Sequence, residues 1–254
     1  MLYVVEDIGK REYFEDAHSV KIKLYKDYDY VSIFDGHGGD AVANYLKFHL
    51  KDYVKKHLVL GKPPKLALHD AFQEAHNSLP KSTSYMTGSA VVVILRKQDM
   101  IWVANCGDSR AILSTTHIVI PLSDDHKPNR KDEHIRITQL GGTVTFNEND
   151  VPRVQGNLAL SRSIGDKYLH PYVICDPEIL EMKLDKSAQY IVLASDGLFD
   201  VLSNMEVCDI IDNTIRQNTS KHTKKLLHSC NVNLLQESRI RGSQDNVTIM
   251  LWML

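Results

Sequence analysis

Four aspartates stand beside apolar runs that have the length and composition of β-strands. They are Asp35 after residues 30–34, Asp108 after residues 101–106, Asp196 after residues 190–195, and Asp245 shortly before residues 247–251. Three of the four have a glycine as a direct neighbour, which lets the backbone turn sharply or come close to a ligand. If these strand ends meet in the fold, the sequence places four carboxylates around one point.

Carboxylates gathered in this way repel one another unless cations hold them together. An all-oxygen donor set suits hard cations such as Mg²⁺ or Mn²⁺, whereas zinc selects cysteine or histidine ligands. Two such ions, about 3.5–4 Å apart, can activate a water for attack on phosphorus. An aspartate next to a glycine is also typical of an ordinary turn. Because a turn does not require the acid at four separate strands, the repetition favours a metal centre.

A glycine-rich segment after the first of these aspartates permits a different interpretation. Residues 36–41 (G-H-G-G-D-A) match the G-x-G-x-x-A fingerprint of dinucleotide-binding proteins between a strand and a helix. However, Asp35 would direct a negative charge at the pyrophosphate, and residues 54–57 supply no acid for the ribose. The phosphate-binding pattern G-x-x-x-x-G-K-[ST] is absent from the sequence. The residues therefore disfavour a nucleotide site.

The hydrophobic pattern predicts the elements that must position these residues. Strand-like apolar runs occur at residues 30–34, 89–95, 101–105, 111–113, 190–194 and 247–253. Val20, Ile22 and Leu24 alternate with polar residues, as in a half-buried strand. Helical spacing predicts helices near residues 42–57, 68–79 and 224–235. The capping box of Ser203 and Glu206 begins another helix.

The order of these elements predicts the fold class. Strands come in adjacent pairs with helices between the pairs, rather than in strict alternation with helices. This order favours an α+β fold with antiparallel sheets over a doubly wound parallel sheet. We expect one domain, residues 1–254.

The composition is that of an ordinary globular protein. The 254 residues carry a formal net charge of −2, with 43% hydrophobic and 24% charged residues. A charge near zero argues against a polyanion-binding surface, so we expect no nucleic-acid partner. Four cysteines without a C-x-x-C pair fit neither a disulfide scaffold nor a zinc ribbon, and they indicate a reducing compartment. No apolar run approaches membrane length and no secretory signal pattern is present, so we expect a cytoplasmic and/or nuclear protein without membrane contact.

Short motifs extend the pattern of the strand-end acids along most of the chain. They are R-E-Y-F-E-D at residues 11–16, D-G-H-G-G at 35–39, G-D-S-R at 107–110, D-H-K-P at 125–128, S-R-x-x-G-D at 161–166, D-P-E at 176–178, S-D-G-L-F-D at 195–200, and D-N at 245–246. In this order they resemble the metal-dependent type 2C protein serine/threonine phosphatases. Phe14 stands where that family has methionine, an apolar exchange that leaves the metal chemistry unchanged.

The resemblance implies a fold and a metal centre. The fold would be a four-layer α-β-β-α sandwich, with two antiparallel sheets flanked by helices. Two Mg²⁺ or Mn²⁺ ions would lie at one end of it. Asp35 would bridge the two ions, together with the carbonyl of Gly36. Asp196 and Asp245 would complete one ion, and Glu15 would hold waters of the other.

The same resemblance implies roles for five further residues. Asp16 would lie behind the metal ligands. Asp108 and Asp200 would contribute to a weaker third metal site. Arg11 would bind the substrate phosphate, and His37 would act as the general acid. From the residues alone, Arg11 could equally form a surface ion pair with a neighbouring glutamate, Glu12 or Glu15.

We therefore expect a metal-dependent protein serine/threonine phosphatase that hydrolyses phosphoserine and phosphothreonine by a metal-activated water. It would act in signalling as a monomer whose partners are phosphorylated proteins. Residues 127–153 would form a flap beside the cleft. Two alternatives stay open. A catalytically silent phosphatase-like binding module would have lost metal ligands, and another two-metal phosphoester hydrolase would share them.

Overall fold

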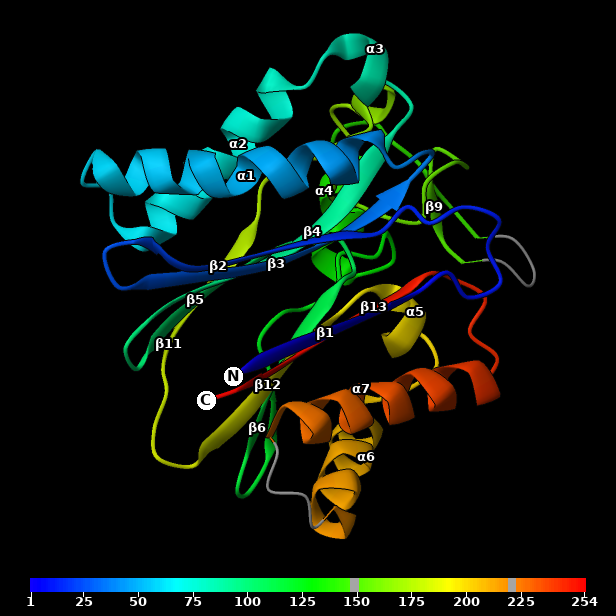
Figure 1. Cartoon of the computed structure of the whole chain (residues 1–254). Helices are drawn as coiled ribbons and strands as arrows, with labels where there is room; N and C mark the ends of the chain where they lie inside the picture. The colour runs from blue at the N-terminus through cyan, green and yellow to red at the C-terminus, as the bar shows by residue number, and fades with distance from the viewer. Residues whose placement is uncertain (147–150, 219–222) are drawn as a thin grey trace.

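The protein is a sandwich of two antiparallel sheets with helices on both outer faces (Figure 1). The computed structural model describes residues 1–146, 151–218 and 223–254. One sheet has the strand order β1 (Leu2–Asp7), β13 (Val247–Met253), β12 (Ala188–Ala194), β6 (Arg110–Thr115) and β7 (Val119–Pro121). The other has the order β11 (Glu178–Lys183), β5 (Met100–Cys106), β4 (Gly88–Lys97), β3 (Tyr28–His37) and β2 (Ala17–Tyr25), with the short β10 (Ile164–Gly165) paired to β4.

Helices form the two outer layers. The helices α1 (Ala41–Val59), α2 (Pro64–Ser78) and the short α3 (Lys81–Ser84) lie on the side of the six-stranded sheet. The helices α6 (Asn204–Gln217) and α7 (Thr223–Ile240) lie on the side of the five-stranded sheet, and the short α5 (Asp196–Phe199) follows β12. The expected α+β sandwich of two antiparallel sheets flanked by helices is thereby confirmed.

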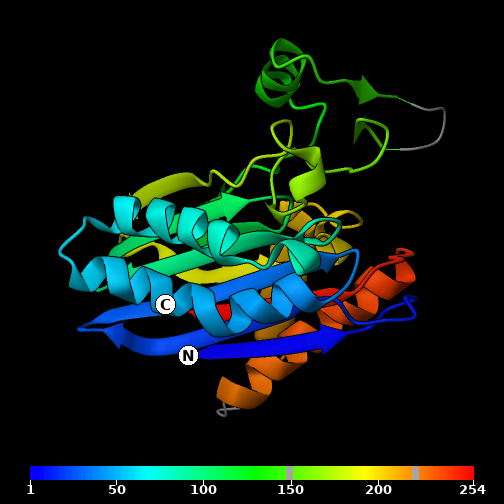
Figure 2. The same ribbon diagram turned by 90° about the horizontal axis from the view of Figure 1, so that it is seen from above.

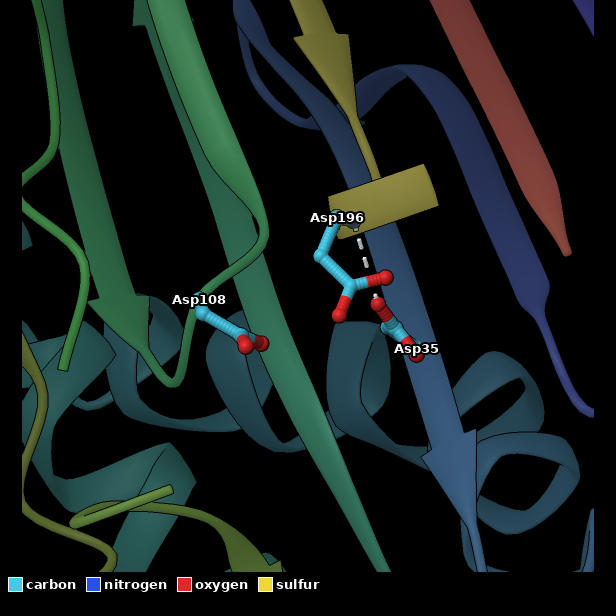
Figure 3. Close-up of side chains that lie close together, drawn as sticks. All are labelled: Asp35, Asp108 and Asp196. Atoms are coloured by element: carbon cyan, nitrogen blue, oxygen red, sulfur yellow. Dashed lines mark hydrogen bonds between the residues drawn. The ribbon is translucent and has the colours of Figure 1, made fainter. Parts of the chain in front are cut away.

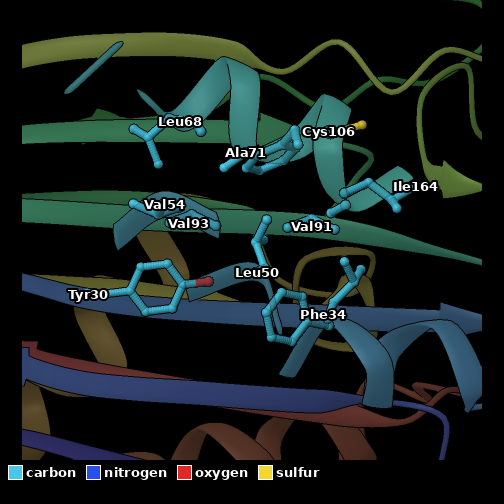
Figure 4. Close-up of a cluster of buried hydrophobic side chains, with 14 of the residues drawn as sticks. Tyr30, Phe34, Leu50, Val54, Leu68, Ala71, Val91, Val93, Cys106 and Ile164 are labelled. Atoms are coloured by element: carbon cyan, nitrogen blue, oxygen red, sulfur yellow. The ribbon is translucent and has the colours of Figure 1, made fainter. Parts of the chain in front are cut away.

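Three apolar clusters hold these layers together. Val31 and Ile33 of β3 point between the sheets, whereas Tyr30 and Phe34 of the same strand pack against α1 and α2 (Figure 4). A third cluster lies between the five-stranded sheet and the helices α6 and α7. Because central strands are buried on both faces, they are continuous apolar runs rather than alternating ones. This double burial explains why the runs stood out in the sequence.

The expectation for β2 was wrong in its detail. Val20 and Ile22 are 36% and 54% exposed, whereas Leu24 is buried. The pairing of β2 with β3 is irregular between Lys21 and Tyr25, and Lys23 has a φ of +54° within that interval. An irregularity of this kind reverses the face on which later side chains lie. At the edge of a sheet, the alternation therefore did not identify the buried face.

One segment stands out from the sandwich. It contains α4 (Lys131–Gln139) and the small hairpin of β8 (Val144–Thr145) and β9 (Arg153–Val154), which Figure 2 shows projecting beyond the layers. This is the region expected to form a flap, although residues 147–150 lie outside the described residues. In the described parts of the chain, no helix is long and apolar enough to cross a membrane.

Candidate metal centre and active site

Three of the four strand-end aspartates meet at one end of the sandwich. Asp35 lies near the end of β3, Asp108 follows β5 after one glycine, and Asp196 begins α5 after one serine that follows β12. One carboxylate oxygen from each lies within 4.8 Å of the other two (Figure 3). Because β3 and β5 belong to one sheet and β12 to the other, the cluster forms where the two sheets meet.

Two carboxylates of this cluster, those of Asp35 and Asp196, are destabilised in their charged form by burial and by their neighbours. Burial raises the pKa of Asp35 well above its usual range, and the neighbouring carboxylates, Asp196 foremost, raise it further. Burial raises the pKa of Asp196 in the same way, with Asp108 adding to the effect. Within the trio, the Asp196 backbone N–H donates a hydrogen bond to Asp35 Oδ2 at 3.3 Å. The three carboxylates offer only oxygen ligands, they repel one another, and Asp108 is buried while Asp35 and Asp196 are partly exposed, so the set fits a hard divalent cation that solvent can reach.

Asp16 ties the two sheets together next to this cluster. It is only 7% exposed and accepts hydrogen bonds from Ser195 Oγ at 2.9 Å and Thr248 Oγ1 at 2.7 Å. Burial outweighs these hydrogen bonds and raises the pKa of Asp16 to about 7. Ser195 and Thr248 had no role in the sequence interpretation. Each stands beside or near a predicted ligand, and that proximity is the signal that could have identified them.

The segment that carries Arg11 and Glu15 is attached to the start of β13. Arg11 Nη2 lies 2.5 Å from Asp245 Oδ2, so the arginine pairs with a predicted metal ligand rather than with Glu12. Asn246 Oδ1 accepts a hydrogen bond from the Glu15 backbone N–H at 2.7 Å. A Cβ on Gly36 would lie 2.4 Å from the carbonyl oxygen of Glu15, so only glycine permits this approach.

Lys127 contacts the cluster through Asp108. Its ammonium group donates a hydrogen bond to Asp108. Burial opposes the charge on Lys127, but the carboxylates of Asp108 and Asp200 outweigh burial and raise its pKa. Asp200 follows α5, one turn beyond Asp196, and burial raises its pKa. Sequence reasoning assigned no role to Lys127, although it lies within the D-H-K-P motif.

His37 is the last residue of β3 and lies two residues after Asp35. Its Nε2 lies 2.6 Å from Asp166 Oδ2. Burial opposes the charge on the ring, but the Asp166 carboxylate outweighs it and raises the pKa of His37. Asp166 belongs to the S-R-x-x-G-D motif and was not predicted as a site residue.

Comparison with known proteins decides the family. The model of the protein phosphatase 2C family matches residues 9–247. The chain belongs to this family. It is 36% identical over 248 residues to probable protein phosphatase 2C 52 of Oryza sativa subsp. japonica, covering 96% of this chain and 48% of that protein. It is 37% identical over 247 residues to probable protein phosphatase 2C 45 of the same organism, covering 96% and 83%. The chain thus spans about half the length of the first of these protein phosphatase 2C relatives.

Solved structures of low sequence identity share the protein phosphatase 2C fold seen here. A serine-threonine phosphatase 2C from Toxoplasma gondii superposes with a TM-score of 0.85 at 22% identity, covering 99% of this chain and 94% of that one. A C. elegans sex determining protein superposes with a TM-score of 0.89 at 20% identity, covering 100% and 64%. The fold and the family expected from the motifs are therefore confirmed.

The division of the protein phosphatase 2C acids among separate ions stays a prediction. The three-residue cluster includes Asp108, which had been assigned to an outer site, and does not include Asp245 or Asp200. Asp245 is instead paired with Arg11. The site thus contains a set of hard-cation ligands, an exposed guanidinium and a partly exposed imidazole. Such an arrangement can bind a phosphate, polarise it and protonate a leaving group.

Proposed function

We propose that the chain is a Mg²⁺- or Mn²⁺-dependent protein serine/threonine phosphatase that acts on phosphoserine and phosphothreonine in proteins. The observation that carries the proposal is the cluster of Asp35, Asp108 and Asp196, whose oxygens converge within 4.8 Å. Membership of the protein phosphatase 2C family supports the same reaction. The complete set of acids argues against a catalytically silent binding module, which would not need to keep them.

The residues that would hold the ions come from both sheets. The two central ions would be held by Asp35, the carbonyl of Gly36, Asp196, Asp245 and Glu15, and a third, weaker ion by Asp108 and Asp200. When bound, such ions supply an activated water and positive charge for the phosphoryl oxygens. Asp16 orders Ser195 and Thr248 behind this set, so it would help to keep the strand ends in place.

The remaining steps belong to two side chains. Arg11 is more than half exposed, so its guanidinium can turn from Asp245 toward a phosphate and donate charge-assisted hydrogen bonds to its oxygens. His37 would donate a proton to the serine or threonine oxygen as the phosphorus–oxygen bond breaks. Protonation matters because an alkoxide is a poor leaving group. No cysteine is needed as a nucleophile, and burial raises the pKa of the Cys106 thiol well above its usual range.

The test compares a phosphoserine peptide with bis(p-nitrophenyl) phosphate, a phosphodiester, each with EDTA or with Mn²⁺. We expect hydrolysis of the peptide only with Mn²⁺, and loss of that activity in Asp35→Asn. Asp27→Asn changes an exposed aspartate in the turn between β2 and β3, and it serves as the matched control. Faster hydrolysis of the diester would identify another two-metal hydrolase. Hydrolysis of neither compound would identify a binding module.

A further inference from the structure

His37 and Asp166 form a close pair in which one side chain is partly exposed and the other is buried. His37 Nε2 lies 2.6 Å from Asp166 Oδ2. The histidine side chain is 25% exposed, whereas that of Asp166 is 1% exposed. The carboxylate therefore reaches the imidazole from the buried side, and the ring reaches solvent on the other side.

Three strands bring the two residues together. In the pairing of β3 with β4, His37 lies opposite Gly88. In the pairing of β10 with β4, Gly165 lies opposite the same Gly88. Gly88 thus stands between the histidine and the residue that precedes Asp166. A Cβ on Gly88 would lie 1.9 Å from Asp166 Oδ2 and 2.5 Å from His37 Nε2, so the hydrogen bond occupies the space that a side chain would need.

The position of Asp166 is fixed independently of the histidine. Ser163 Oγ donates a hydrogen bond to Asp166 Oδ2 at 2.5 Å. The backbone N–H of Asp166 donates to the carbonyl oxygen of Thr87 at 3.1 Å, next to Gly88. Asp166 has a φ of +45° and a ψ of +40°, a left-handed conformation that aspartate and asparagine tolerate better than most residues. The carboxylate is therefore held in place before any substrate arrives.

We propose that Asp166 is a positioning residue that holds the His37 imidazole through Nε2, so that Nδ1 is the nitrogen that faces the leaving-group oxygen. The two ring nitrogens point away from each other, so a bond from Nε2 to the interior turns Nδ1 outward. The inference rests on the proposed function, in which His37 is the proton donor. Asp166 does not touch the substrate and acts only through the ring.

With this assignment, every bond and proton of the hydrolysis is accounted for. Water forms a bond to phosphorus while the bond from phosphorus to the serine oxygen breaks. The serine oxygen takes the proton from Nδ1 of His37, and the proton that the water releases restores the ring. Throughout, Asp166 accepts the hydrogen bond from Nε2–H. The products are the free hydroxyl and hydrogen phosphate.

The kinetic test uses two substrates that differ in their need for protonation. We expect Asp166→Asn to lower kcat for a phosphoserine peptide at least about tenfold, and to change kcat for p-nitrophenyl phosphate by less than about threefold. His37→Gln should show the same difference between the two substrates, which we call the leaving-group split. Because Asp166 acts through His37, the double variant should be no slower than His37→Gln within about twofold. Equal losses on both substrates, or losses that multiply in the double variant, would overturn the inference.

A matched control tests a similar pair outside the proposed site. His57 Nε2 lies 3.0 Å from Glu74 Oε2 in the contact between α1 and α2. Glu74→Gln therefore removes a carboxylate partner of a largely buried histidine without touching the site. We expect it to leave both substrates at wild-type rates. A leaving-group split in this variant would overturn the assignment of the effect to Asp166.

A spectroscopic readout keeps the test independent of activity and of whether Asp166→Asn folds. In the wild-type chain with Mg²⁺, the His37 ring proton that is hydrogen-bonded and slow to exchange should be assigned by NMR to Nε2. Finding it on Nδ1 would overturn the inference. An inactive wild-type chain that shows the Nε2 proton would contradict the proposed function instead. An active chain with a leaving-group split in His37→Gln but none in Asp166→Asn would contradict only the positioning role.

Discussion

Arg11 Nη2 lies 2.5 Å from Asp245 Oδ2, although 234 residues separate the two along the chain. The pair joins a group proposed to bind phosphate to a residue proposed to bind metal. The hydrogen bond with Asp245 raises the pKa of the guanidinium, which stays charged. Because the arginine side chain is 56% exposed, it can move between the carboxylate and an incoming phosphate. Substrate binding and metal binding are therefore expected to influence each other through this contact.

Arg11→Ala tests that coupling. We expect KM for a phosphoserine peptide to rise about tenfold or more, because a charge-assisted hydrogen bond of about 1.5–3 kcal/mol is lost. We expect Mn²⁺ to bind more tightly in calorimetry, because the variant removes a positive charge beside Asp245. Arg241→Ala, which changes another exposed arginine in ion pairs with glutamates, is the control. An unchanged KM would show that Arg11 does not bind the phosphate and only forms a surface ion pair with Asp245.

Asp35→Asn should have opposite effects on stability and on turnover. The pKa of Asp35 is raised on folding, so its ionised form opposes folding at neutral pH, and this cost falls as the pH falls. The asparagine removes that charge, so we expect Tm in EDTA to rise by a few degrees, since 1 kcal/mol corresponds to about 2–4 °C in a chain of this size. The stabilisation by added Mg²⁺ should disappear, and turnover should fall by several powers of ten.

Calorimetric scans with and without Mg²⁺ measure the Tm in EDTA and the stabilisation by Mg²⁺, and a phosphopeptide assay measures turnover. Asp27→Asn, on the exposed turn, should keep the wild-type response to Mg²⁺. A lower Tm for Asp35→Asn in EDTA would show that the carboxylate is stabilised by the protein alone. Wild-type turnover would remove Asp35 from the metal site.

Asp108→Asn distinguishes the central ions from an outer one. If Asp108 belongs to a weaker outer site, wild-type activity should keep rising with Mg²⁺ after the two central sites are saturated. Asp108→Asn should lose that late rise. Tight binding of the first two ions should stay unchanged in calorimetry. The structure also places Asp108 in the cluster with Asp35 and Asp196. Loss of tight binding would therefore assign Asp108 to the central site, and an unaltered metal titration would leave it a turn residue bound to Lys127.

Glu133 of α4 is expected to make the stability of the fold depend on pH in the acid range. Its carboxylate is 1% exposed and pairs with Arg162 at 2.7 Å and Arg136 at 2.8 Å. Burial alone would raise the pKa of Glu133, but the hydrogen bonds from both arginines outweigh it and lower the pKa from 4.5 to about 2. The folded form therefore binds the proton less readily than the unfolded chain. About 3 kcal/mol of stability should be present above about pH 4.5 and lost as the pH falls toward 2.

Glu133→Gln should remove this contribution. We expect a lower free energy of unfolding at pH 7 and a shallower loss of stability between pH 4.5 and 2. Urea unfolding at several pH values measures both. Glu181→Gln on β11, where the glutamate is exposed, should behave like the wild type. The same acid dependence in wild type and Glu133→Gln would mean that the arginines do not stabilise the carboxylate.

Much of the local structure follows from short stretches of sequence. The capping box is one case: Ser203 Oγ accepts from the Glu206 N–H at 3.3 Å, and Glu206 Oε2 accepts from the Ser203 N–H at 2.9 Å. Four consecutive residues contain everything that this start of α6 requires. The central strands are similar, because burial on both faces leaves a continuous apolar run that local inspection detects. At the edge strand β2 this signal was lost, and Val20 proved to be exposed.

The sequence by itself also determined which acids stand at strand ends and in which order, and with them the family. Only the tertiary structure decided which groups meet. His37 and Asp166 are 129 residues apart, and Asp16 and Thr248 are 232 apart. Their contacts depend on which strands pair and in which register, and a shift of one residue would turn each side chain to the other face of its sheet. No local pattern states which side chains meet, so the contacts of Asp166 with His37, of Lys127 with Asp108 and of Thr248 with Asp16 became visible only in the folded chain.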